Sequence, residues 1–142
     1  AMDIALGPVT LTDNILPFLW HKLAINAVIN PLTALYNCNN GELAKVQYQQ
    51  QINQILAEVC QVAEAAGYPL QYAQMLEKVQ QVIQSTAANF SSMQQDIIHK
   101  RRTEIDAING YIVTQAARYN IAVPFNTQLM QQVLQLQHRT RN

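Results

Sequence analysis

The chain has 142 residues, enough for one domain that buries a hydrophobic core without a metal or a disulfide. Nine Lys and Arg residues balance nine Asp and Glu residues, so no excess of positive charge favours nucleic acid or an anionic membrane as a partner. The two cysteines, Cys38 and Cys60, are too few for a disulfide framework or a cysteine metal motif, which is expected of a protein of the cytoplasm.

The first residues, AMDIALGPVT, lack the basic and apolar regions of a signal peptide. Ala1 before Met2 is interpreted as the remnant of a tag. No apolar run reaches the roughly 18 residues that a membrane-spanning helix needs. We therefore expect residues 1–2 to be a tag remnant and start, and residues 3–142 to form a single domain.

A first helical region is predicted from Thr12 to Asn37. Pro17 is compatible with a first helical turn, because the first N–H groups of a helix have no partner within the helix. Pro31 predicts a break or a kink. The region is therefore expected to form two helices or one bent helix.

Within that region, the segment KLAINAVIN places Lys22, Asn26 and Asn30 four residues apart. An α-helix turns about 100° per residue, so these three polar side chains share one face. The stripe fits a partly exposed polar edge of an amphipathic helix. It also fits a face that binds a small oxygen-rich anion, because asparagine offers a donor and an acceptor and lysine offers a mobile positive charge. Both interpretations are open at this point.

The middle of the chain is also predicted to be helical. A polar connection, NCNNG, precedes a long helix that ends near Gly67. The apolar positions of this helix are Val46, Ile52, Ile55, Val59 and Val62. Another helix is expected at about 71–88, and Ser92 with Gln95 fits a capping box at the start of a short helix.

Two more helices are predicted at the end of the chain. Thr103 and Asp106, in the sequence TEID, form a start signal for a helix that reaches about Tyr119. Pro124 and Asn126 introduce the last helix. Because the alternation typical of strands is nearly absent, we predict an all-α bundle of about six to eight helices with little or no strand.

Motifs for nucleotides and metals are missing from the sequence. The four glycines form neither GxGxxG nor GxxxxGK[ST], so the chain is expected to have no phosphate-binding loop of its own. The three histidines lack the spacing of metal ligands, and no metal site is expected. The basic run HKRR at 99–102 is interpreted as a solvated turn, and both cysteines as small buried hydrophobic residues.

Four blocks, in this order along the chain, carry a resemblance to a known family. They are WHKLAINAVINPLTALYNCNNGEL, NFSSMQQD, RTEIDAINGYIV and IAVPFNTQL. Together they resemble the successive motifs of the C-terminal domain of ketopantoate reductase (2-dehydropantoate 2-reductase), over nearly the whole chain. The resemblance implies a helical domain similar to the C-terminal domain of 6-phosphogluconate dehydrogenase-like reductases. It also implies that the N-terminal Rossmann domain, which carries the NADPH loop, is absent from this sequence.

The resemblance gives the polar stripe a role. Lys22 would be the general acid that protonates the ketone oxygen, because an ammonium both stabilises the developing alkoxide and supplies its proton. Asn26, Asn30 and Asn40 match asparagines that bind the substrate in this family.

Three further positions are implied by the same motifs. Ser92, the second serine of NFSSM, matches the serine that binds the substrate carboxylate, and Asn89 is a candidate for the same cleft. Glu104, in RTEID, matches an acidic residue that contacts the cofactor. From position alone, Glu104 would be only an acidic residue favoured in the first turn of a helix.

The implied reaction is the reduction of 2-dehydropantoate to pantoate by NADPH, a step towards pantothenate and coenzyme A. The partners would be this small-molecule substrate and the Rossmann domain, with a homodimer formed through the face that the missing domain leaves uncovered. Without that domain, we expect the isolated chain to be inactive and to bind NADPH weakly or not at all.

Three alternatives stay open. An enzyme that reduces another 2-keto acid would share the same motif residues. A stand-alone helical binding module would retain them as relics, and a helical oligomerisation scaffold would make no use of Lys22. The sequence that precedes Met2 in the natural protein would separate these alternatives, since a Rossmann fingerprint there indicates an enzyme.

Overall fold

The computed structural model describes the backbone of residues 9–141 and the side chains of residues 16–141. Residues 1–2, interpreted above as a tag remnant, lie outside this range. The described residues form six α-helices and three 3₁₀ helices, and they contain no strand. The predicted all-α class and the predicted number of helices are therefore confirmed.

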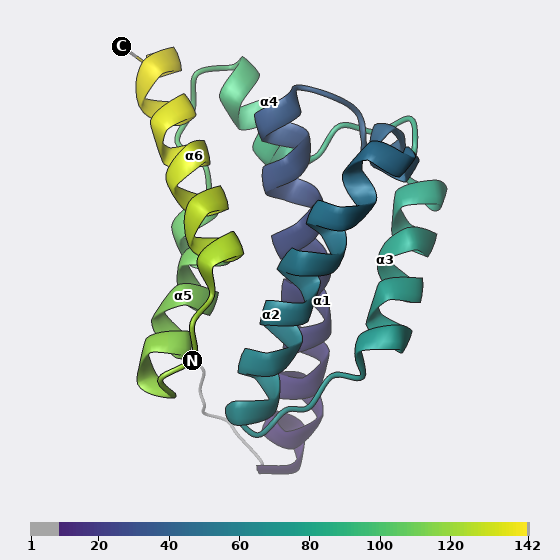
Figure 1. Ribbon diagram of the computed structural model, residues 1–142, viewed down its shortest axis with the longest axis vertical. Helices are drawn as coiled ribbons and strands as arrows, with labels where there is room; N and C mark the ends of the chain where they lie inside the picture. Colours follow the sequence, from purple (N-terminus) through teal and green to yellow (C-terminus); the bar gives the residue numbers. More distant parts are fainter. Residues whose placement is uncertain (1–8, 142) are drawn as a thin grey trace.

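The α-helices are α1 (Val9–Tyr36), α2 (Gln49–Ala65), α3 (Tyr72–Ser85), α4 (Ser92–Ile98), α5 (Asn109–Arg118) and α6 (Pro124–Arg141). The 3₁₀ helices are η2 (Asn40–Ala44), η3 (Val46–Tyr48) and η4 (Ile105–Ala107). In Figure 1, α5 and α6 pair on the left, α3 lies on the right, and α1 and α2 lie between them. Helix α1 packs against α2, α3, α4 and α6, so it is the central element of the bundle.

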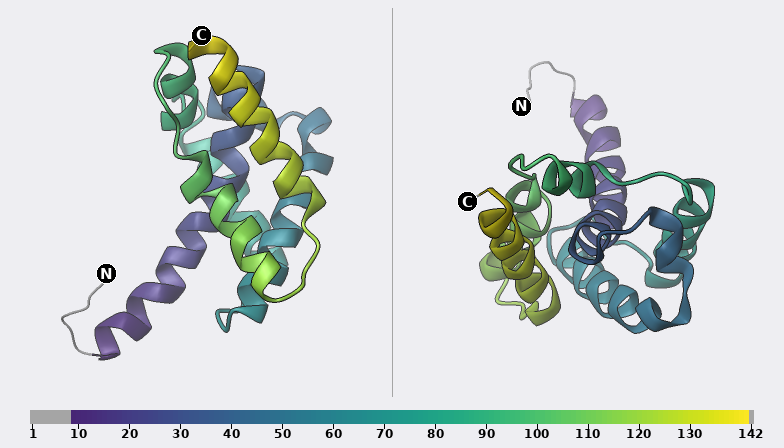
Figure 2. Two further views of the ribbon diagram at one scale, coloured as in Figure 1. Left: turned by 90° about the vertical axis from the view of Figure 1, so that its left-hand side faces the viewer. Right: turned by 90° about the horizontal axis from the view of Figure 1, so that it is seen from above.

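Helix α1 divides into a projecting part and a buried part. Its N-terminal turns extend beyond the other helices (Figure 2), and the side chain of Phe18 there is 65% exposed. From Trp20 onward the helix has a buried apolar face, with Ala24, Ala27 and Val28 fully buried. The helix begins at Val9, so Pro17 lies in its interior and not in its first turn, contrary to the prediction.

Pro31 lies inside α1 and does not end it. Proline has no N–H group, so the carbonyl oxygen of Ala27, four residues earlier, loses its helical partner. The side-chain nitrogen Nδ2 of Asn109, at the start of α5, donates to this oxygen at 3.1 Å. A donor from another helix thus satisfies the carbonyl that Pro31 leaves free. Of the two alternatives predicted, two helices or one bent helix, the structure excludes the first.

The same asparagine belongs to a buried network that joins four helices. Asn109 Nδ2 also donates to Asn126 Oδ1 in α6, at 3.0 Å. In turn, Asn126 Nδ2 donates to Glu58 Oε1 of α2 at 2.8 Å and to the carbonyl oxygen of Ile55 at 3.2 Å. The Glu58 carboxylate also accepts the backbone N–H groups of Phe125 (3.0 Å) and Asn126 (2.9 Å). A side chain of α2 therefore caps the N-terminus of α6.

Two predicted helix starts are wrong because of local geometry. Val46 was expected on the apolar face of the second helix, but it lies in η3 and its side chain is 87% exposed, since α2 begins only at Gln49. Thr103 and Asp106 were expected to open a helix, but the chain forms the single turn η4 there and α5 begins only at Asn109.

The capping box predicted at Ser92 and Gln95 is also wrong. The side chain of Ser91 accepts the backbone N–H of Gln94 at 3.0 Å, so Ser91 is the N-cap and Ser92 is the first residue of α4. The spacing from Ser91 to Gln94 satisfies the same sequence rule, and the local sequence does not distinguish the two registers.

Replacement of Glu58 tests the network that joins α2 to α6. Glu58→Ala leaves three buried N–H donors without their acceptor, so we expect the free energy of unfolding to fall by about 3 kcal/mol. Urea unfolding followed by circular dichroism measures this change. Glu64→Ala, an exposed position on the same helix, is the matched control and should change stability by less than about 0.5 kcal/mol. Equal effects of the two substitutions would contradict the capping role.

Candidate functional site

The polar stripe lies on α1 as the spacing predicts. Lys22 is exposed, and Asn26 and Asn30 are partly exposed. Within residues 16–141, none of these three side chains forms a hydrogen bond or an ion pair. Their polar groups are therefore available to a ligand or to another part of the protein. Thr33, eleven residues after Lys22, continues the same helix face, because eleven residues make about three turns.

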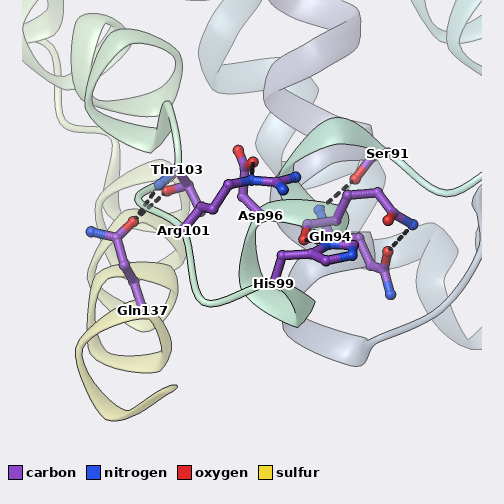
Figure 3. A network of polar contacts seen from close by, with 8 residues as sticks. Ser91, Gln94, Asp96, His99, Arg101, Thr103 and Gln137 are labelled. Carbon is purple, nitrogen blue, oxygen red and sulfur yellow. Dashed lines mark hydrogen bonds and ion pairs between the residues drawn. The ribbon is translucent and has the colours of Figure 1, made fainter. Parts of the chain in front are cut away.

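Helix α4 is attached to the C-terminal end of this stripe. The hydroxyl oxygens of Thr33 and Ser91 lie 2.7 Å apart. Nε2 of Gln94 donates to Oδ1 of Asn37, just after α1, at 2.8 Å. Figure 3 shows Ser91 and Gln94 at the start of α4, joined by the capping bond. Ser92 follows directly and is exposed, so the structure brings its segment to the helix that carries Lys22 and Asn30.

The segment before Ser91 is attached to η2. The backbone N–H of Asn40 donates to the carbonyl oxygen of Asn89 at 2.9 Å, and that of Gly41 donates to the carbonyl oxygen of Ala87 at 3.0 Å. A Cβ atom on Gly41 would lie only 2.8 Å from the Cβ of Ala87, so this close approach requires glycine. Two backbone bonds therefore fix the connection that leads to Ser91.

Asn40 is buried, unlike the asparagines of the stripe. Its Nδ2 donates to the hydroxyl of Thr86 at 2.9 Å, and its Oδ1 has no hydrogen-bond partner among the described residues. One of the two N–H groups of this amide is therefore used within the fold, and its oxygen is buried without a partner. Asn89, the additional candidate, is exposed on the same connection.

Glu104 lies directly before η4, in the segment that leads to α5. The preceding Thr103 donates from both its backbone nitrogen (2.8 Å) and its hydroxyl (2.7 Å) to Oε1 of Gln137 in α6 (Figure 3). Glu104 is exposed, and its carboxylate forms no ion pair within the described residues. It is therefore free to accept hydrogen bonds from a ligand.

Helix α5 follows this segment and contacts the middle of α1. Asn109 bonds to the backbone of Ala27, and the ring of Tyr111 lies 5.9 Å from that of Trp20, measured between centroids. Lys22 and Asn26 lie between Trp20 and Ala27 on α1. The helix that follows the TEID segment thus contacts the part of α1 that carries Lys22 and Asn26, although the structure records no contact between Glu104 and Lys22.

The best-defined pockets lined entirely by described residues lie away from these positions. One is formed by the C-terminal end of α1 with α4 and α6, and the others lie along α6. None of the six predicted site residues lines them. We further predict that Lys22, Asn26, Asn30, Ser92 and Glu104 line one concave surface, and this stays a prediction.

The sequence interpretation missed two residues at this site, Thr33 and Ser91. Thr33 carries a detectable signal, because it continues the helix face of Lys22. Ser91 carries no such signal, since the choice between Ser91 and Ser92 as the cap depends on a contact 58 residues away in the chain.

The two cysteines are poor nucleophiles in this fold. Cys60 is buried, and burial raises the pKa of its thiol from 9.0 to about 11. Cys38 is partly exposed, which corrects the expectation that both are buried. The pKa of Cys38 is also raised, mainly by desolvation and further by the nearby charge of Glu42.

No group of three or more possible ligands is arranged to hold a metal within the described part of the chain. No helix in that part is long and apolar enough to cross a membrane.

The described residues thus form an all-α domain whose central helix carries a stripe of unpaired polar side chains. Residues 14–137 match the family model described as "Ketopantoate reductase PanE/ApbA C terminal". This match covers most of the chain, and the chain belongs to this family.

Similar proteins agree with this assignment. The 2-dehydropantoate 2-reductase of Vibrio cholerae is 46% identical over 133 residues, which are 94% of this chain and 45% of that protein. Among solved structures, D-mandelate dehydrogenase with NADH and anilino(oxo)acetate has a TM-score of 0.86 and 25% identity, over 92% of this chain and 43% of that one. A dimeric ketopantoate reductase from Staphylococcus aureus has a TM-score of 0.80 and 26% identity, over 89% of this chain and 45% of that one. The chain thus spans less than half the length of these relatives.

The raised pKa of Cys60 predicts how stability depends on pH. Below about pH 9 the thiol is protonated in both folded and unfolded chains, but between about 9 and 11 only the unfolded chain loses the proton. Stability should therefore fall over this range, with Cys60 contributing about 2 kcal/mol of the loss by pH 11. Denaturant unfolding at pH 8, 9, 10 and 11 measures the slope. Cys60→Ala should give a shallower fall, and equal slopes would contradict the assignment.

Proposed function

We propose that this chain is the substrate-binding and proton-donating half of an NADPH-dependent 2-dehydropantoate 2-reductase. The observation that carries the proposal is the unpaired stripe of Lys22, Asn26 and Asn30, with the start of α4 attached at its end. The family and the name of the similar Vibrio cholerae protein support this choice of reaction. The activity belongs to a longer protein, since the chain spans less than half of that relative.

Lys22 is the proton donor in this proposal. When bound, NADPH supplies a hydride to the carbonyl carbon of the substrate. The ammonium of Lys22 stabilises the negative charge that develops on the ketone oxygen and gives that oxygen its proton. The absence of a carboxylate partner for Lys22 within the described residues suits this role, because an ion pair would compete with the alkoxide.

Asn26 and Asn30 hold the substrate beside this lysine. Each amide offers two N–H donors and one carbonyl acceptor, which suits hydroxyl and carbonyl groups of a small 2-keto acid. The positions lie about 6 Å apart along the helix axis, a spacing that a substrate of this size can span. Ser92 binds the carboxylate, and Asn40 contributes its free Oδ1.

The cofactor is bound mainly by a part of the protein outside this sequence. No glycine-rich phosphate loop is present among these 142 residues. Glu104 fits a contact with the cofactor, because its carboxylate is exposed and unpaired within the described residues. We propose NADPH as the cofactor; the similar D-mandelate dehydrogenase is bound to NADH.

A second candidate is an enzyme of the same family that reduces a different 2-keto acid. The structural similarity to D-mandelate dehydrogenase favours it, because that enzyme has a TM-score of 0.86. The stripe residues would serve either substrate. Rates for a panel of 2-keto acids with the full-length protein separate the two candidates.

We further propose a cytoplasmic location and a homodimer, the latter because the similar Staphylococcus aureus enzyme is dimeric.

The role of Lys22 is tested in the full-length protein. Lys22→Ala should lower kcat and kcat/KM together by about 10²-fold or more, because the lost interaction is strongest in the transition state. Steady-state kinetics with 2-dehydropantoate and NADPH measure both constants. Lys78→Ala, which removes an exposed lysine from α3, is the control and should leave them unchanged. A Lys22→Ala enzyme with near-normal kcat would return the stripe to its interpretation as a polar edge.

Asn30 should affect binding more than chemistry. Its hydrogen bond is made to bound substrate as well as to the transition state, so Asn30→Ala should mainly raise KM for the keto acid. The loss should be roughly 1 to 3 kcal/mol, which is about 5-fold to 150-fold in KM. Asn53→Ala, an exposed asparagine on α2, is the matched control. A lower kcat with an unchanged KM would contradict this role.

The isolated chain should not reduce 2-dehydropantoate, and it should bind NADPH weakly or not at all. The reason is that the elements that bind the phosphates are expected elsewhere in the protein. Isothermal titration calorimetry with NADPH tests the prediction directly. Micromolar affinity for these 142 residues would show that they contain a nucleotide site of their own.

A further inference from the structure

Two buried hydroxyl groups connect α1 to the start of α4. Thr33 is fully buried, and Ser91 is buried beside it. Oγ1 of Thr33 lies 2.8 Å from the carbonyl oxygen of Ile29, 3.0 Å from that of Asn30 and 2.7 Å from Oγ of Ser91. The hydroxyl of Thr33 thus contacts the backbone of Asn30, a predicted substrate-binding residue, and Ser91, which precedes the predicted residue Ser92.

Each of the two hydroxyl groups has one hydrogen to donate. The bonds of Thr33 to the carbonyl oxygens of Ile29 and Asn30 can use only its own O–H, whereas either hydroxyl can be the donor in the bond between Thr33 and Ser91. The oxygen of Ser91 also accepts the backbone N–H of Gln94 at 3.0 Å. Ser91 therefore links α1 to the N-cap of α4, whichever hydroxyl donates.

Other bonds hold the same segment on both sides of Ser91. Gln94 Nε2 donates to Asn37 Oδ1, and Gln95 Nε2 donates to Gln94 Oε1 at 3.0 Å. On the N-terminal side, the carbonyl oxygen of Asn89 accepts from the backbone of Asn40. Ser92, which forms no such bond itself, is thus attached to a segment with little freedom to move.

We propose that Thr33 and Ser91 are positioning residues, which fix Ser92 at the C-terminal end of the stripe formed by Lys22, Asn26 and Asn30. The inference rests on the proposed function, in which Ser92 binds the carboxylate of a 2-keto acid. Thr33 lies three residues, or about one turn, after Asn30, so its hydroxyl couples the two sides of the substrate site. Neither Thr33 nor Ser91 contacts the substrate.

The test uses Thr33→Val in the full-length protein. Valine keeps the shape of threonine but has no hydroxyl, so Ser91 loses its hydrogen-bond partner on α1. KM for 2-dehydropantoate should rise about tenfold, while kcat stays within about twofold and KM for NADPH is unchanged. Thr33→Ser should keep the original KM. Thr127→Val is the matched control, because the hydroxyl of Thr127 in α6 donates only to the carbonyl oxygen of Val123, four residues earlier in the chain.

A double substitution shows whether Thr33 acts through Ser92. If it does, Thr33→Val should add little to the increase in KM that Ser92→Ala causes alone. Independent, multiplying effects on KM would overturn the inference. Should Thr33→Val fail to fold, Ser91→Ala removes the same hydrogen bond together with the cap on Gln94, and it is expected to raise KM by at least as much.

The outcomes separate this inference from the function on which it rests. A wild-type enzyme that reduces no 2-keto acid would overturn the proposed function, and the inference with it. An active wild-type enzyme whose KM is unchanged by both Thr33→Val and Ser91→Ala would overturn the inference alone. In that case the hydroxyl pair would serve only stability, which a lower melting temperature at constant KM would reveal.

Discussion

The hydrogen bond from Asn109 to the carbonyl oxygen of Ala27 is the interaction on which the architecture of the site depends. Pro31 removes an N–H from the middle of α1, and a buried carbonyl without a partner would cost about 1–3 kcal/mol. With the donor from α5, the helix continues to Tyr36 and carries Thr33 on the face of Lys22. A proline that normally ends a helix therefore becomes a point at which a second helix is attached.

Further hydrogen bonds connect this attachment to α6 and α2, and nearly all polar groups in the network have a partner. Asn126 accepts the second hydrogen bond of Asn109 and itself donates to Glu58. The carboxylate of Glu58 in turn caps α6. Buried amides and carboxylates have strict partner requirements, so such a network fixes the relative positions of α1, α2, α5 and α6 more narrowly than apolar contacts do. On the opposite side, the bond between Thr33 and Ser91 fixes α4. The stripe lies on a helix held from both sides.

The sequence predicts the features that depend on local spacing and fails where distant residues decide. Helical periodicity is enough for the all-α class and for the shared face of Lys22, Asn26 and Asn30. That α1 continues through Pro31 without a break has a non-local cause, because the compensating donor, Asn109, lies 82 residues from Ala27 in the chain. The wrong cap at Ser92 has a similar cause. Spacing alone also gives no reason to place Ser92 or Glu104 near the stripe, and only the family resemblance does so.

The charged residues of this chain are divided between structure and chemistry. The carboxylate of Glu58 is buried and its oxygens accept three N–H groups, so its charge is committed to the fold. Lys22 and Glu104 are exposed, and neither has an ionic partner within the described residues. An exposed ammonium in water stabilises an alkoxide weakly, since the solvent screens the interaction; its effect grows when another surface excludes water from the site. In the proposed function this open face, with its unpaired functional groups, forms one half of an interdomain active site. The fold itself satisfies most of its buried polar groups internally, with Oδ1 of Asn40 and of Asn109 as exceptions among the described residues.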